Sequence, residues 1–175
     1  MTKLQTICLL GLTLLMATSL PSQAGRKSGV QLSLVPPIQL FNEIDEVVGA
    51  RLGVIADNER MSGCDLSLVN MTADRFVGAE FGILNYSRMD TFGLQFGPVN
   101  HAGMIKGCQF GLVNHTRELR GVQFGVINRA GANRMLQLGV INFGENAKGW
   151  QFGLFNFNTY YNAGLPVMMI INGSF

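Results

Sequence analysis

The chain has 175 residues, of which 47% are apolar and 14% charged, and its thirteen Lys and Arg against eleven Asp and Glu give a formal net charge of +2. This near balance excludes bulk electrostatic attraction to nucleic acid. Only three cysteines are present, which excludes a small scaffold held together by disulfides.

Residues 1–24 have the features of a secretory signal peptide. Lys3 supplies a positive start, an apolar run of helix formers follows from Ile7 to Ala17, and the string SQA at 22–24 offers small residues for cleavage after Ala24. The apolar run is shorter than the roughly 20 residues that a bilayer-spanning helix needs. We therefore predict that this segment is removed and that the protein is exported.

The rest of the chain repeats one motif every fourteen or fifteen residues. Its consensus is Gly, any residue, Gln, Phe, Gly, two apolar residues and Asn, as in GCQFGLVN at 107–114 and GVQFGVIN at 121–128. A period this short predicts one small unit stacked on itself. The predicted divisions after the signal peptide are an N-terminal cap with a degenerate repeat (25–48), eight tandem repeats (49–156) and a C-terminal cap (157–175).

Each position of the repeat forms a column, and we count positions from the first Gly as 0. Position +2 is Gln in five of eight repeats and Arg51, Asp65 or Glu80 in the others. Because charged side chains are almost never buried without partners, this column is predicted to face water. Alternation along a strand then predicts that the apolar positions +1, +3 and +5 form the core, with the Phe-rich column +3 at its centre.

The end of the motif predicts a corner. Position +6 is also apolar, so we expect +5 and +6 both to turn inward, and Asn follows at +7 in every repeat except that of Ala56. Asn tolerates left-handed backbone angles and bonds its own backbone, which suits a corner. Stacked corners are predicted to form an Asn ladder in which each side-chain amide bonds its neighbours. The small residues at +9 are predicted to face inward, and so are the residues two positions before the next Gly. The Gly at +4 is predicted to face water.

These columns favour an all-β, single-domain parallel β-solenoid with coils of about 14 residues. The same corner residue recurs after every strand, as expected if identical corners stack. The alternative is an antiparallel outer-membrane β-barrel, for which the alternating strands and the terminal Phe175 are typical. The six or seven apolar residues of each repeat are fewer than the 9–11 that a membrane strand needs.

Both ends of the stack are degenerate repeats. The string GVQLSLV at 29–35 matches positions 0 to +6 before Pro36 and Pro37, and LPVMMIIN at 165–172 matches a last copy without its Gly and Gln. Atypical terminal copies protect the open edges of a stack.

The tandem Q-x-G-x-x-N motif, the signal peptide and the closing string IINGSF together resemble the bacterial surface repeat-containing proteins, over residues 29–175. This resemblance implies an exported protein that is displayed on the cell surface. The motif is also similar to the curlin repeat of amyloid surface fibres, where Asn-x-Ala follows as it does at 100–102 and 128–130. Curlin repeats are longer and carry further Ser and Gln positions that this chain lacks.

Two groups of residues invite a catalytic or metal-binding interpretation. Asp65 and Glu80 occupy neighbouring rungs of column +2 at about 5 Å, near the spacing of a retaining glycosidase pair, but a flat strand face offers no cleft and Arg51 lies one rung away. His101 and His115 follow corner Asn residues, whereas Cys108 belongs to the core column +1, so the three do not converge on a metal. We expect no catalytic site, no metal and no cofactor.

The sequence offers two binding surfaces. Lys106, Arg120, Arg134 and Lys148 occupy the position before Gly in four successive repeats, and Arg129 lies after a corner Asn. Such a basic column suits an acidic surface polymer such as lipopolysaccharide or a host glycan. The Gln/Gly face from Gln95 to Gln151 is the second, flat and uncharged, and suits another surface protein.

The leading functional hypothesis is therefore a non-enzymatic, surface-displayed structural or adhesive module, without a nucleic-acid partner. The alternatives are an outer-membrane barrel that forms a small pore and, more weakly, a glycan-active enzyme on a solenoid.

Overall fold

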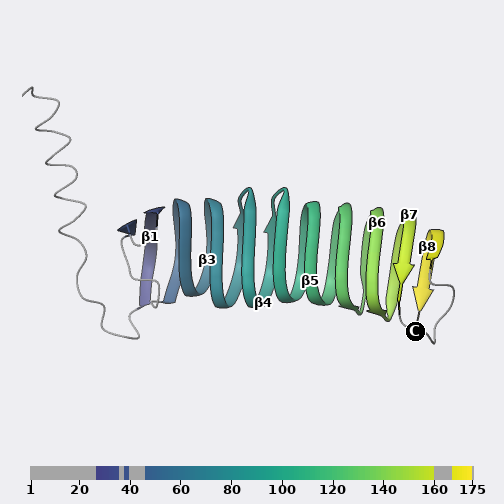
Figure 1. The fold of residues 1–175 in the computed structure, drawn as a ribbon. Helices are drawn as coiled ribbons and strands as arrows, with labels where there is room; N and C mark the ends of the chain where they lie inside the picture. The colour runs from purple at the N-terminus through teal and green to yellow at the C-terminus, as the bar shows by residue number, and fades with distance from the viewer. Residues whose placement is uncertain (1–26, 36–37, 40–45, 160–166, 175) are drawn as a thin grey trace, which may run out of the picture.

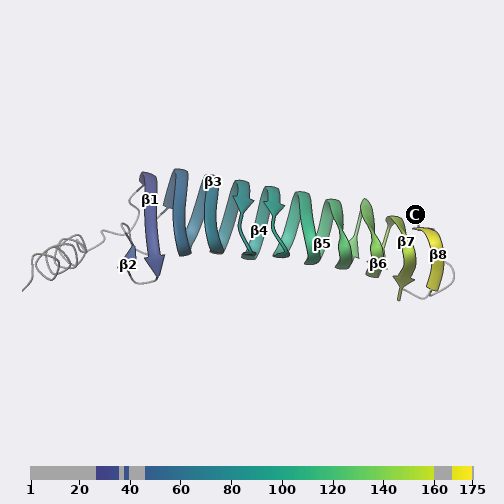
Figure 2. The ribbon, with the colours of Figure 1, turned by 90° about the horizontal axis from the view of Figure 1, so that it is seen from above.

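The computed structural model describes residues 27–35, 38–39, 46–159 and 167–174, which form one eight-stranded sheet wound into a rod (Figures 1 and 2). The sheet order is β2-β1-β3-β4-β5-β6-β7-β8. The strands are β1 (Lys27–Val35), β2 (Ile38–Gln39), β3 (Glu46–Phe81), β4 (Leu84–Phe96), β5 (Val99–Asn133), β6 (Leu136–Ala147), β7 (Gly149–Asn158) and β8 (Val167–Ser174). No helix able to span a membrane occurs in these ranges.

The repeats stack in parallel and in register. Asn85 of β4 pairs with Asn100 of β5, and Gln95 pairs with Gln109, so each residue lies over its counterpart one rung away. The same parallel pairing joins β1 to β3, β3 to β4, β5 to β6 and β6 to β7. The predicted parallel β-solenoid is confirmed, and the antiparallel barrel is wrong because neighbouring repeats run in the same direction.

The two ends of the rod carry antiparallel strands. The N-terminal copy has the predicted register, with Gln31 opposite Arg51, and β2 then folds back against β1. The C-terminal copy does not continue the coil: β8 runs antiparallel to β7 and places Asn172 opposite Gln151. The prediction of a last parallel coil was therefore wrong. The predicted signal peptide, and Pro36 and Pro37, lie outside the described residues.

The interior of the rod is polar, which reverses the predicted core. Every residue at position +2 is buried: Arg51, Asp65, Glu80, Gln95, Gln109, Gln123, Gln137 and Gln151. The corner Asn residues are buried too, and so are the small residues at +9. The larger residues two positions before Gly, such as Phe76, Ile105 and Leu119, supply the apolar part of the interior, as predicted.

The apolar columns that we expected to form the core lie on the outside. At position +3, Phe124 keeps 54% of its surface exposed while its neighbour Gln123 has 0%. Positions +5 and +6 also point outward, and no residue of columns +1, +3, +5 or +6 is fully buried. The prediction failed because the charged residues at +2, which we took to need water, find partners inside the rod.

Glycine at two positions explains why the interior is narrow. The Gly at +4 faces inward, not toward water as predicted: a Cβ on Gly111 would lie 2.6 Å from Asn100 Nδ2. The Gly at position 0 has a φ of +130° to +147° from Gly63 to Gly107, and a Cβ on Gly107 would lie 1.9 Å from the Gly93 carbonyl oxygen. At Gly107 and Gly111 only glycine fits these contacts between rungs.

Candidate functional site

A ladder of glutamine side chains runs through the interior. Each Gln donates through Nε2 to the Oε1 of the Gln one rung before it, at 2.7–2.8 Å from Gln109 to Gln151. The same nitrogen reaches a backbone oxygen at +8 on the opposite strand, as Gln123 does to Arg129 at 3.3 Å. These amides hold the two strands of a rung together. They are buried, so the predicted docking surface on the Gln/Gly face was wrong.

The glutamine ladder ends at three charged residues. Gln95 Nε2 donates to Glu80 Oε2 at 2.6 Å, and Arg51 forms a buried ion pair with Asp65 from the other side. Two carboxylates thus face each other across one rung. Burial raises the pKa of Glu80 to about 8, with a smaller contribution from Asp65, and burial also raises the pKa of Asp65 despite Arg51.

Asp65 and Glu80 were the only predicted catalytic candidates, and their surroundings differ from the prediction. We expected a solvated ladder of charges, but both side chains have no exposed surface. A glycosidase pair must contact its substrate. The burial of these carboxylates supports a structural role for them.

A second ladder consists of the corner asparagines, and it confirms the predicted Asn ladder. Asn100 Nδ2 donates to Asn114 Oδ1 at 2.8 Å and to the Phe110 carbonyl oxygen at 2.9 Å, and the pattern continues along the column. The Asn amides donate toward the C-terminus, opposite to the Gln amides. They satisfy carbonyl groups at the corner, where the chain reverses.

We call the apolar surface around this corner the apolar ridge. Its members are the exposed or half-exposed residues at +3 (Leu52, Leu66, Phe81, Phe96, Phe110, Phe124, Leu138, Phe152), at +5 (Val54, Leu68, Ile83, Pro98, Leu112, Val126, Val140, Leu154) and at +6 (Ile55, Val69, Leu84, Val99, Val113, Ile127, Ile141, Phe155). The crest of the ridge is the corner at +5. Its two sides are the strand face that carries +3 and the strand face that carries +6.

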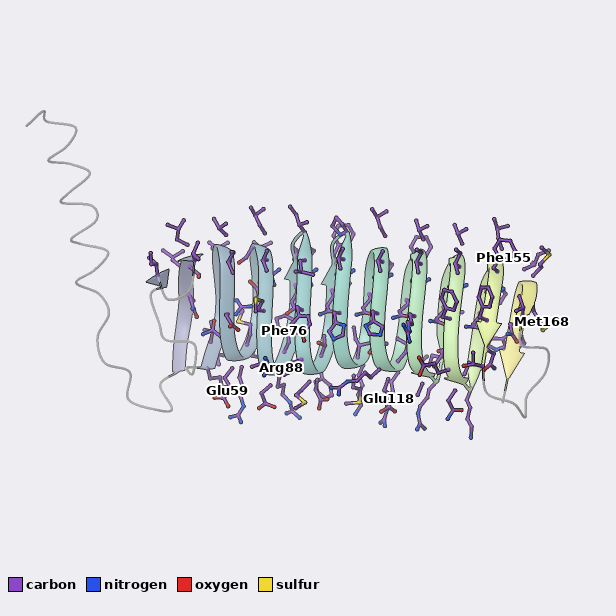
Figure 3. The ribbon with its side chains drawn as sticks, in the orientation of Figure 1. Glu59, Phe76, Arg88, Glu118, Phe155 and Met168 are labelled. Atoms are coloured by element: carbon purple, nitrogen blue, oxygen red, sulfur yellow. The ribbon has the colours of Figure 1, made fainter. Side chains whose placement is uncertain are left out.

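A group of charged side chains lies at the opposite edge of the rod. In Figure 3, Glu59, Arg88 and Glu118 lie at the lower edge among side chains with nitrogen and oxygen atoms, whereas carbon-only side chains project from the upper edge. Along the chain, the corner at +5 is about half a rung from these charged residues, so it lies at the opposite edge. The apolar ridge therefore runs along the upper edge. The sequence showed both sets of residues, but not that they occupy opposite edges.

The basic column predicted from the sequence is exposed and regular. Lys106, Arg120, Arg134 and Lys148 are all exposed, on the same strand face as positions +1 and +3. Glu118 Oε1 accepts from Arg120 Nε at 2.8 Å and from Arg134 Nε at 3.0 Å, so one carboxylate partly neutralises the middle of the column. Arg129 lies apart on the other face and pairs with Glu145 at 2.7 Å. Anion binding by these residues stays a prediction.

Column +8, on the face that carries +6, contains rings stacked from rung to rung. Tyr86 stacks on His101 with ring centroids 4.7 Å apart, and Phe143 stacks on Phe157 at 4.6 Å. From the sequence we placed His101, His115 and Arg129 in this column but did not identify the stacked rings, because the members of the column differ in chemistry and only their spacing is constant. The two phenylalanines and the Arg129–Glu145 pair border an open groove.

His101 and His115 meet in this column, while Cys108 lies elsewhere, as predicted. Their Nδ1 atoms are 2.9 Å apart, and partial burial lowers the pKa of both imidazoles, with the neighbouring cationic groups adding to it. Two imidazoles offer a metal two ligands, fewer than the three or four protein ligands of zinc sites. Within the described ranges His, Cys, Asp and Glu form no group of three that could hold a metal ion.

The two cysteines of the repeats differ from the prediction in one respect. Cys64 and Cys108 are free thiols, as expected from their separation by three rungs. However, they are half-exposed on the outer face at +1 and are not core residues.

The chain matches no family model, and no curated protein or solved structure is significantly similar to it.

Proposed function

We propose that this protein is an exported, surface-displayed structural module without enzymatic activity, which holds its partners through the outer columns of a rigid rod. The observation that carries this proposal is the apolar ridge. Soluble monomers rarely expose contiguous apolar patches larger than a few hundred Å². A ridge that repeats along the whole stack therefore favours a protein that works while attached to something else.

The interior supports a scaffold rather than a binding pocket. The side-chain nitrogen atoms of its Gln and Asn columns donate within the two amide ladders, and glycine at +4 leaves little room beside them. The outer columns, in contrast, present the same chemistry at intervals of about 4.8 Å. Repetition of one contact along a rod gives avidity to a partner that is itself extended.

The basic column supports an adhesive contribution from the same module. Its four cations point outward on one face, and the Glu118 carboxylate lies beside only two of them. An acidic surface polymer matches this column in charge and in extended shape.

Surface proteolysis of intact cells tests the proposed function. Protease added to intact bacteria that produce the protein should degrade it while a cytosolic marker stays whole, and fractionation should recover the chain with the cell envelope. If the chain is protected until the cells are lysed, and is recovered with the cytosol, the proposal is wrong.

A further inference from the structure

The shape of the apolar ridge restricts what can cover it. Exposed apolar side chains lie on two opposite faces and on the crest between them: Phe124 at +3 and Val126 and Ile127 at +5 and +6 keep 37–54% of their surface exposed. A second copy docked flat on one face, as in a β-sandwich, would cover that face and leave the crest and the other face in water. A fluid apolar medium surrounds all three surfaces at once.

We propose that the apolar ridge inserts into one leaflet of a lipid bilayer that carries anionic headgroups, with the rod lying along the membrane plane. This inference rests on the proposed function, since it names the partner that holds the module at the surface.

The backbone of the ridge is already satisfied, as insertion requires. In a bilayer each unpaired N–H or C=O group costs several kcal/mol. At the crest, Ile83 N donates to Leu68 O at 2.9 Å, Val99 N to Ile83 O at 3.1 Å, and Leu112 N to Pro98 O at 3.0 Å. The Asn ladder takes up carbonyl groups at +3 beside the crest. The ridge therefore presents apolar side chains over hydrogen-bonded backbone.

The dimensions of the ridge match a single leaflet. Four residues separate +1 from the crest at +5, roughly 13 Å of extended chain. The hydrocarbon of one leaflet is about 15 Å deep, half of a 30 Å bilayer core. Along the rod, the crest from Val54 to Leu154 spans seven rung spacings, or roughly 34 Å.

The chemistry below the ridge follows the order of a membrane interface. Amphipathic rings stand at the next level, with Trp150 at +1 and Tyr86 at +8, and such rings concentrate where hydrocarbon meets headgroups. One step further, the basic column before Gly stands where lipid phosphates lie. The charged edge with Glu59 and Glu118 then remains in water (Figure 3).

Vesicle flotation tests this inference. The purified full chain should float with vesicles of phosphatidylcholine and phosphatidylglycerol, and less with phosphatidylcholine alone. The double variant Leu112→Lys and Leu154→Lys changes two crest residues that are 58% and 61% exposed, so we expect it to fold, which its circular dichroism spectrum checks. It should lower the partition coefficient about tenfold or more, because lysine is costly on a lipid-facing surface.

The control is Met89→Lys, which places one lysine, against two in the crest variant, at a residue 48% exposed on the charged edge. It should bind vesicles like the wild type. All variants keep residues 1–24, so any binding by that segment is common to them. Trp150, the single tryptophan, gives a second measurement: brominated lipids should quench its fluorescence in the wild type and the control.

Three results would overturn the inference: folded wild type that stays at the bottom of the gradient, equal flotation of the crest and control variants, or a lipid-free dimer that buries the ridge and ignores vesicles. None of these results bears on surface display, which the proteolysis of intact cells tests separately.

Discussion

At the scale of single residues, the interior of this rod depends on the pairing of buried side-chain amides. An amide buried without a partner costs about 1–3 kcal/mol, whereas a paired one contributes modestly to stability. The ladders give amides such as those of Gln123 and Asn128 a partner on the neighbouring rung and a backbone carbonyl. The sequence predicted the columns correctly, because period and alternation follow from spacing alone.

The sequence did not predict which columns face inward, and the reason lies in Arg51, Asp65 and Glu80. We read these charges as a sign of water, but Arg51 pairs with Asp65 and Glu80 accepts from Gln95. A signal for the correct orientation was present. The Gly at +4 lies two residues after +2, so both point to the same face of the strand. Glycine beside an amide column on that face indicates a narrow interior that could not hold a column of phenylalanine.

Glu80 makes the stability of the rod depend on pH. Burial raises its pKa from 4.5 to about 8, so between these values the folded chain holds a proton that the unfolded chain releases. Stability should therefore fall as pH rises from about 4.5 to about 8, by at most about 5 kcal/mol from this group. Asp65, whose pKa is also raised, acts in the same direction.

The variant Glu80→Gln continues the Gln ladder and should remove most of this dependence. It should be more stable than the wild type at pH 8 and close to it at pH 4.5, as measured by the urea midpoint. Gln95→Glu, which adds a third buried carboxyl beside Asp65 and Glu80, serves as the opposite control and should be less stable at pH 8. Parallel pH profiles for wild type and Glu80→Gln would contradict this account of Glu80.

At the scale of the rung, two departures from the repeat consensus are coupled by a contact between neighbouring rungs. Ala56 replaces the corner Asn in one rung, and Ser67 replaces the Gly at +4 in the next. In later rungs the Asn amide lies against that Gly, as Asn70 Nδ2 lies 2.6 Å from a Cβ built on Gly82. An Asn at 56 would meet the Ser67 side chain. Asn70 Oδ1 is accordingly left as a buried acceptor without a partner.

The double variant Ala56→Asn with Ser67→Gly should extend the Asn ladder by one rung. Ala56→Asn alone should destabilise the chain by about 1–3 kcal/mol through overpacking. Ser67→Gly alone should cost about 1 kcal/mol, since it loses a bond to Asp65 and adds a flexible residue. The double variant gains a donor for Asn70 Oδ1, worth about 1 kcal/mol.

A double-mutant cycle in urea measures this coupling. We expect the double variant to be more stable than the sum of the two single changes by at least about 1 kcal/mol. Additive effects would show that the two exceptions are independent and that the ladder ends at Asn70 for another reason.

At the scale of the whole molecule, the solenoid inverts the usual distribution of side chains. Because backbone and side-chain hydrogen bonds run along the rod, stability does not require a large apolar core, and the apolar columns remain available for a partner. The parallel stack and the degenerate N-terminal copy were predictable from sequence. The antiparallel direction of β8 was not predictable, because the apolar pattern of LPVMMIIN suits a strand of either direction.

In the inverted rod Gln123 lies inside and Phe124 outside, and NMR of the lipid-free chain measures both positions. We expect slow solvent exchange of the Gln123 side-chain amide and strong broadening of the Phe124 ring by a soluble paramagnetic agent. Fast exchange of the Gln123 amide together with an unbroadened Phe124 ring would contradict this arrangement.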